Sequence, residues 1–211
     1  MWLFFGDSLT EGSNCYYSFT DFIDPIYNPT NLGVSGTTIG EYSIYPVDGH
    51  SLLRQIAKYK MYVKKASVIF IEYGSNDVSA VMCGFATIQT VVVSLVKAVD
   101  WIKQLNPYCK IVFLAPGSDD IISTKAVRMC NYLEKDYFKK FDFNFPTSVY
   151  ADIYKQIISQ VNNICDIIYM FDDEMISEEY LSDDNIHPNE QGHKRIANNI
   201  MHGMKKLLHY I

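Results

Sequence analysis

The chain opens with Trp2-Leu3-Phe4-Phe5-Gly6-Asp7-Ser8-Leu9-Thr10-Glu11-Gly12, in which a short apolar run leads directly into Gly-Asp-Ser. The run predicts a buried strand, because residues 2–5 are hydrophobic without interruption and a glycine follows them. A serine placed directly after such a strand lies at its carboxyl end, where ligands bind in open α/β sheets. Gly-Asp-Ser is also ordinary turn chemistry, so this stretch alone does not separate a nucleophile from a bend.

The change from an apolar strand to a polar turn recurs along the chain. Residues 67–73 are apolar and β-branched and stop at Gly74, and residues 109–115 break at Pro116. Strands that are apolar on both faces belong to parallel sheets covered on both sides. Further strand signals occur in 31–38, where a strand end opens into a glycine loop, and in 166–171.

Helical segments separate these strands. The clearest is 88–105, where apolar residues recur at intervals of three and four and form one face, and Asn106-Pro107 follows it. The alternation of strands and helices predicts a three-layer α/β/α sandwich around a parallel sheet of about five strands. Because no linker or internal repeat divides the sequence, we expect one domain over 1–211. The other helices are expected at 16–23, 51–63, 121–141, 148–163 and 189–209.

Composition excludes several classes of function. The chain of 211 residues has a formal net charge of −6 and no cluster of Lys or Arg longer than a pair, so we exclude nucleic acid as its main partner. No apolar run approaches the roughly 18 residues of a membrane span. No basic region precedes the first apolar run, so we expect a cytoplasmic protein. The five cysteines are widely spaced without a Cys-x-x-Cys pair, which argues against disulfides and zinc.

Four short motifs follow predicted strands or precede the last helix. Taken singly, each has a structural reading: a bend, a turn glycine, a helix N-cap, or the start of the last helix. Because the carboxyl ends of parallel strands share one edge, the four are expected to form one site. They are Gly6-Asp7-Ser8-Leu9, Asn31-x-Gly33-x-x-Gly36, Gly74-Ser75-Asn76-Asp77 and Asp184-x-x-His187-Pro188.

Three of these residues can perform nucleophilic chemistry together. A serine hydroxyl is a poor nucleophile at neutral pH and needs a base within hydrogen-bond reach, which His187 can be for Ser8. A carboxylate must hold the other ring nitrogen of that histidine. Asp183 and Asp184 both precede it, and the Asp-x-x-His spacing selects Asp184. The other histidines have no partner motif, and we expect surface or helix positions for them: His50, His193, His202 and His209.

The order and spacing of the four motifs resemble those of the SGNH/GDSL hydrolase superfamily, and the resemblance covers residues 6–188. It implies the flavodoxin-like fold of that superfamily, with Ser8 as nucleophile and an Asp184/His187 pair. It also implies an oxyanion hole made by the backbone N–H groups of Ser8 and Gly36 and the side-chain amide of Asn76. Gly33 and Asn31 are expected to support the loop that reaches Gly36. Thr10 stands where a nucleophile elbow, Gly-x-Ser-x-Gly, has its second glycine, which disfavours an α/β-hydrolase.

We therefore expect a serine esterase that hydrolyses carboxylic esters through an acyl-serine intermediate, without a metal or an organic cofactor. A short acyl group is expected, and an O-acetyl ester on a carbohydrate is the leading substrate. The sequence leaves open a lysophospholipase, a thioesterase or an acyltransferase on the same fold, and also a catalytically silent binding protein. It does not indicate the oligomeric state.

Overall fold

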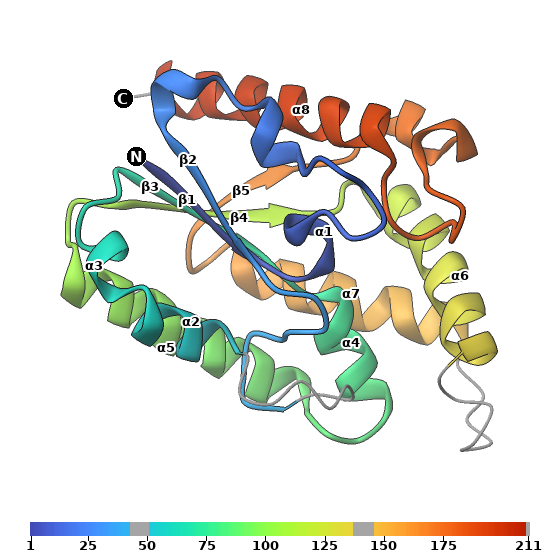
Figure 1. Cartoon of the computed structure of the whole chain (residues 1–211). Coiled ribbons are helices and arrows are strands. Elements are labelled where there is room, and N and C mark those ends of the chain that lie inside the picture. Colours follow the sequence, from blue (N-terminus) through green and yellow to red (C-terminus); the bar gives the residue numbers. More distant parts are fainter. Residues whose placement is uncertain (43–50, 137–145, 210–211) are drawn as a thin grey trace.

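The computed structural model describes residues 1–42, 51–136 and 146–209 (Figure 1). Its centre is a sheet with the strand order β2-β1-β3-β4-β5. Every neighbouring pair of strands is parallel, so the predicted α/β architecture with a five-stranded parallel sheet is confirmed. The strands are β1 (Trp2–Gly6), β2 (Pro29–Gly33), β3 (Val68–Glu72), β4 (Lys110–Ala115) and β5 (Asp166–Tyr169).

Alternate residues of the central strands enter two separate hydrophobic cores. In β1, Leu3 and Phe5 pack in the core under one face, whereas Trp2 and Phe4 pack in the other. This period of two follows from the alternating direction of side chains along a strand. Because both faces are covered, the first strand reads as a continuous apolar run.

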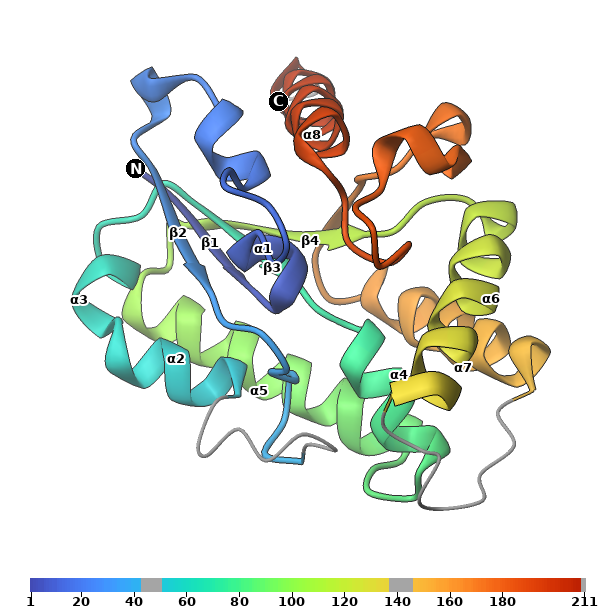
Figure 2. The same cartoon turned by 45° about the vertical axis from the view of Figure 1, so that its right-hand side comes forward.

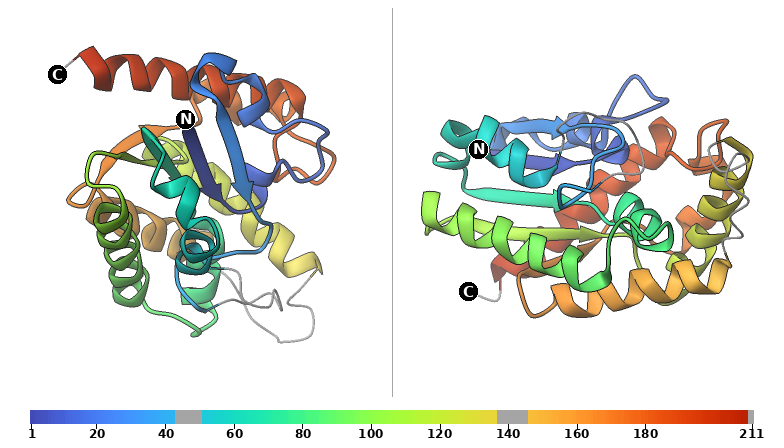
Figure 3. Two further views of the ribbon diagram at one scale, coloured as in Figure 1. Left: turned by 60° about the vertical axis from the view of Figure 1, so that its left-hand side comes forward. Right: turned by 90° about the horizontal axis from the view of Figure 1, so that it is seen from below.

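Helices form the two outer layers (Figures 2 and 3). One core is closed by α2 (Leu52–Lys58), α5 (Ile88–Leu105) and α7 (Thr147–Val161), and the other by α8 (Glu190–His209) with the short 3₁₀ helix η1 (Phe19–Phe22). The helix α6 (Asp119–Asp136) stands beyond the carboxyl ends of the strands in Figure 1. Among the described residues, no helix is long and apolar enough to cross a membrane.

Several helix boundaries differ from the expected ones. The segment 16–23 contains only η1, and a second 3₁₀ helix, η2 (Pro25–Tyr27), follows it. The helix expected at 51–63 is broken at Tyr59 into α2 and α3 (Lys60–Val63). The end of the expected helix 121–141 lies outside the described residues. All five cysteines are described and none forms a disulfide.

Two short helices were not predicted from the sequence. They are α1 (Ser8–Glu11) and α4 (Ser75–Met82), and both begin inside a motif. A helix of one or two turns is too short to show an apolar period, so pattern reading misses it. The Asp7 side chain caps α1 by accepting from the Leu9 N–H at 3.1 Å, and Gly12, at φ +89°, ends the helix.

Close packing of β2 against α1 fixes the position of the Gly-Asp-Ser turn. Gly33 is the last residue of β2, and a Cβ added there would lie 2.3 Å from the Glu11 nitrogen. Asn31 donates from Nδ2 to the Thr10 carbonyl at 2.6 Å. The sequence suggested that Gly33 is a turn residue, but the structure requires a glycine there for the close approach of β2 to α1. Asn31 anchors the end of α1.

Replacement of Gly33 by alanine tests this packing. The added methyl group would meet backbone atoms, which cannot move aside as a side chain can. We expect Gly33→Ala to lower the free energy of unfolding by about 3 kcal/mol, the upper part of the range for overpacking. Chemical denaturation measures the change. The control is Gly84→Ala, whose methyl group would meet nothing within 4 Å, although its φ of +76° costs about 1 kcal/mol. A smaller loss in Gly33→Ala than in the control would contradict the account.

Candidate active site

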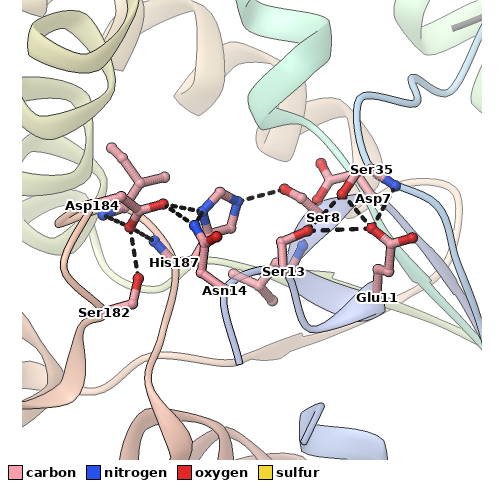
Figure 4. A network of polar contacts seen from close by, with 11 residues as sticks. Asp7, Ser8, Glu11, Ser13, Asn14, Ser35, Ser182, Asp184 and His187 are labelled. Atoms are coloured by element: carbon pink, nitrogen blue, oxygen red, sulfur yellow. Dashed lines mark hydrogen bonds and ion pairs between the residues drawn. The ribbon is translucent and has the colours of Figure 1, made fainter. Parts of the chain in front are cut away.

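The structure brings Ser8 and His187 into direct contact, although they are 179 residues apart (Figure 4). Ser8 is the first residue of α1, at the carboxyl end of β1. Its Oγ lies 2.8 Å from His187 Nε2. The histidine lies on the loop that precedes α8, and this loop is closed by a hydrogen bond from the Ser182 N–H to the His187 carbonyl at 2.8 Å.

Asp184 lies on the opposite side of the His187 ring. Its Oδ2 is 2.6 Å from His187 Nδ1. The turn between the two residues places Asn185 at φ +59°, a conformation that asparagine tolerates. Asp183, the competing carboxylate in the sequence, is exposed, so the structure brings Asp184 and not its neighbour to the histidine.

The Asp184 carboxylate is saturated with hydrogen-bond donors. Its Oδ1 accepts from Ser182 Oγ at 2.8 Å and from the N–H groups of Ile186 and His187, both at 2.9 Å. Burial raises the pKa of Asp184, but the hydrogen bonds from His187, Ile186 and Ser182 outweigh it and hold the pKa well below its usual range. An ionised carboxylate only accepts, so His187 Nδ1 carries the proton and Nε2 accepts from the Ser8 hydroxyl.

Gly36 and Asn76 line the same cleft as Ser8. Gly36 lies in the left-handed region at φ +75°, and Asn76 is the second residue of α4. Asn76 Nδ2 donates to the Thr37 carbonyl at 2.8 Å and to Asp7 Oδ2 at 3.2 Å. The structure therefore places the three expected oxyanion-hole residues around one space, and it gives the Asn76 amide two acceptors within the protein.

The cleft has a volume of about 380 Å³ and two chemically different sides. The α1 side is polar, with Ser13, Asn14 and Ser35. The α6 side carries Lys125, Met129 and Tyr132.

Beneath the nucleophile lies a cluster of ionisable groups that sequence reasoning missed. Glu72 ends β3 and accepts from Thr10 Oγ1 at 3.0 Å. Burial, and next the charge of Asp7, raise the pKa of Glu72 well above its usual range. Burial also raises the pKa of Asp7 and lowers that of Lys125. In the sequence, the position of Glu72 at the end of a predicted strand was a signal that it could lie near the site. Lys125 lies in no motif, so the sequence offered no such signal for it.

Asp77 joins the loop after β2 to α4. Its Oδ1 accepts from the Ile39 N–H and from the Tyr42 hydroxyl, both at 2.9 Å. The side chain is fully buried, and burial raises its pKa to about 7. Because Asp77 directly follows Asn76, it holds the segment after Gly36 close to the amide of that asparagine.

His193 lies in the last helix, α8, as expected, but it is not at the surface, because its exposed fraction is 0%. Its Nδ1 accepts from the Phe19 N–H at 3.1 Å, which ties η1 to the helix, and burial lowers its pKa to about 4. His202 is an exposed helix residue, as expected, His209 ends α8, and His50 lies outside the described residues. Within the described ranges, no three His, Cys, Asp or Glu side chains are grouped to hold a metal ion.

The pKa of Asp77 makes stability depend on pH. Between pH 3.8, its ordinary pKa, and about pH 7, the folded protein keeps a proton on Asp77 that the unfolded chain has released. This contribution to stability is therefore complete at low pH and is lost as pH rises through 7.

Asp77→Asn keeps an acceptor for Ile39 and Tyr42 but does not titrate. We expect the Tm of the variant, relative to wild type, to increase from pH 5 to pH 8, as measured by differential scanning fluorimetry. Asp100→Asn, on the exposed face of α5, is the control. A Tm difference that is independent of pH would contradict this reading.

Comparison with known proteins places the chain among ester hydrolases. Residues 4–195 match the GDSL-like Lipase/Acylhydrolase family. No curated protein sequence matches the chain. Similar solved structures include the psychrotrophic esterase EstA from Pseudoalteromonas sp., at 17% identity and a TM-score of 0.60 over 99% of this chain and 98% of that one. A putative GDSL-like lipase from Parabacteroides merdae is 17% identical, with a TM-score of 0.59 over 97% and 94%. The acetylxylan esterase Axe2 from Geobacillus stearothermophilus is 16% identical, with a TM-score of 0.54 over 96% and 93%. The family match spans most of the sequence and agrees with the parallel sheet and the four motifs, and it shows that the chain belongs to the GDSL-like lipase/acylhydrolase family.

Proposed function

We propose that this protein is a serine esterase that hydrolyses carboxylic esters through an acyl-serine intermediate. The observation that carries the proposal is the continuous chain of hydrogen bonds from Ser8 Oγ through His187 to Asp184, whose serine end opens into the cleft. The Ser8–His187 distance of 2.8 Å allows proton transfer from the serine to the histidine, and the His187–Asp184 distance of 2.6 Å lets the carboxylate orient the ring. The membership in a family of ester hydrolases supports the same reaction.

In the first half of the reaction, Ser8 Oγ attacks the ester carbonyl carbon while its proton moves to His187 Nε2. The tetrahedral intermediate then collapses, the bond to the alcohol oxygen breaks, and His187 returns the proton to that oxygen. In the second half, water attacks the acyl carbon while His187 takes its proton, the bond from that carbon to Ser8 Oγ breaks, and His187 returns the proton to Ser8 as the acid leaves. Asp184 stays ionised throughout and stabilises the imidazolium that forms each time.

The oxyanion of the intermediate is stabilised by donors around the cleft. Ser8 is the first residue of α1, and the N–H of a first helical residue has no acceptor within its own helix. Gly36 contributes a second N–H. Asn76 is held by its shorter hydrogen bond to Thr37, while its longer one, to Asp7, is the one the oxyanion replaces or shares. Donors fixed in this way need little reorganisation when charge develops.

The two sides of the cleft suggest the substrate. A short acyl group fits against Met129 and Tyr132, and an alcohol rich in hydroxyl groups fits against Ser13 and Ser35. A carbohydrate O-acetyl ester has both properties and is our leading substrate. The similarly folded Axe2, named an acetylxylan esterase, agrees with this choice.

Replacement of the nucleophile tests the proposed reaction. Ser8→Ala removes the attacking oxygen, and we expect kcat for p-nitrophenyl acetate to fall by about 10⁴- to 10⁶-fold. Circular dichroism and the Tm establish that the variant is folded. The matched control is Ser159→Ala, on the exposed face of α7, which should keep wild-type turnover. A folded Ser8→Ala with turnover near wild type would overturn the mechanism, and an inactive wild type would point to a binding protein.

The length of the acyl chain tests the proposed substrate. Met129, together with Lys125 and Ile186, lines both the cleft and a further cavity of about 20 Å³, which has room for little more than one water molecule. We therefore expect kcat/KM for p-nitrophenyl esters to be highest for acetate or butyrate and to fall for longer chains. Met129→Ala joins the two spaces and should move the optimum to longer chains.

Met61→Ala, at an exposed methionine of α3, is the control for this series. Release of acetate from O-acetylated xylooligosaccharides, measured with wild type, tests the alcohol part. Highest activity on dodecanoate esters, unchanged in Met129→Ala, would exclude the assignment of a short acyl group to this side of the cleft.

A further inference from the structure

The turn that carries the nucleophile makes a second direct contact with the loop that carries the acid and base. Asn14 Nδ2 donates to Asp184 Oδ2 at 2.6 Å, across 170 residues of sequence (Figure 4). The same nitrogen lies 3.5 Å from His187 Nδ1. Because both nitrogens are donors, they share one acceptor, the Oδ2 atom. Asn14 belongs to none of the four sequence motifs.

A series of backbone hydrogen bonds fixes the distance between Asn14 and the nucleophile. The N–H groups of Gly12 and Ser13 both donate to the Ser8 carbonyl at 3.0 Å, and the Cys15 N–H donates to the Gly12 carbonyl at 3.1 Å. Asn14 lies between these turns at φ +63°, a left-handed conformation that asparagine adopts more readily than most residues. The amide is therefore held at a set position relative to Ser8.

At Asp184, Asn14 supplies a second donor to Oδ2, which within the described part of the chain otherwise accepts a hydrogen bond from His187 alone. All three donors to Oδ1 come from the loop 182–187, whereas Oδ2 accepts from His187 Nδ1 and from Asn14. Among the described residues, Asn14 is the one donor to this carboxylate from outside the loop. Rotation of the carboxylate would break this hydrogen bond together with the bond to His187.

We propose that Asn14 is a positioning residue, which holds the nucleophile turn and the Asp184/His187 pair in register so that Ser8 Oγ stays within hydrogen-bond distance of His187. This inference rests on the proposed serine esterase mechanism. Asn14 acts through Asp184 and does not exchange protons with the substrate. Asn14 also lines the cleft, and with a small aryl ester its loss should affect the rate of the chemical step more than the binding of substrate.

Two variants separate this role from a merely structural one. Asn14→Gly removes the amide and keeps the left-handed backbone. We expect kcat for p-nitrophenyl acetate to fall about tenfold, which corresponds to loss of one hydrogen bond to a charged group, while KM stays within about twofold. Asn28→Gly is the matched control, because Asn28 is also left-handed, at φ +48°, and lies at the end of η2. Its kcat should equal that of wild type.

Asn14→Asp keeps the size of the side chain and replaces the donor by a second carboxylate beside Asp184. Added negative charge near the ring stabilises the imidazolium, so the acid limb of the pH–rate profile should move to higher pH. At pH 7 we expect kcat to fall by up to about tenfold, with recovery as pH rises. A structural role would lower the Tm of these variants without moving the pH profile.

Ser8→Ala, measured in the same assay, separates the two proposals. If Ser8→Ala is inactive, but Asn14→Gly and Asn14→Asp both keep the kcat and the pH profile of wild type, the role of Asn14 is overturned and the esterase mechanism stands. If a folded Ser8→Ala retains turnover, the mechanism itself fails. If Asn14→Gly loses activity and Asn14→Asp shifts the profile, the positioning role is established.

Discussion

The parallel pairing of β1 with both β2 and β3 is the constraint on which the site depends. It brings the carboxyl ends of three strands to one edge, and each end continues into one of the motifs. The Asp7 side chain then joins two of these ends, because Oδ1 caps α1 and Oδ2 accepts from Asn76 on α4. One buried carboxyl group thereby links Ser8, the proposed nucleophile, to Asn76, the proposed side-chain donor to the oxyanion.

This arrangement places carboxyl groups in the protein interior. Asp7, Glu72 and Asp77 are almost fully buried, and burial raises the pKa of each. Their contribution to stability is present at low pH and is lost as pH rises through these raised pKa values. Asp184 behaves in the opposite way, because its pKa is depressed and its contribution is lost as pH falls. Because the pKa of Asp184 lies below its ordinary value and those of the buried acids lie above theirs, there is a range of acid pH in which Asp184 is ionised, as the proposed mechanism requires, while the buried acids keep their protons.

The long helices and strands and the site motifs could be predicted from the sequence, whereas the residues that hold the reactive groups in position could not. The strands β1, β3 and β4 and the helix α5 have clear apolar patterns, and all five strands lie at or next to the expected places. The contacts among Ser8, His187 and Asp184 were expected from motif order together with the geometry of a parallel sheet, and the structure brings these residues together.

The missed features depend on three-dimensional proximity. Asn14 and Lys125 lie in no motif, and nothing in their local sequence shows that one reaches Asp184 or that the other lies close to Asp7 and Glu72. The buried position of His193 depends on η1 folding back onto α8, a contact between segments more than 170 residues apart. Local patterns carry no information on such contacts. The positions of the residues that hold a site together are for this reason harder to predict than those of the reactive groups.

The proposed mechanism depends on the nucleophilicity of Ser8, and covalent labelling measures it most directly. A fluorophosphonate probe reacts when an activated serine oxygen forms a bond to phosphorus and fluoride leaves, so no natural substrate is needed. Peptide mass spectrometry after labelling of wild type should locate one adduct on Ser8, and His187→Ala should label far more slowly. Absence of an adduct on Ser8 in the folded wild type, or an adduct on another serine that persists in Ser8→Ala, would contradict the account.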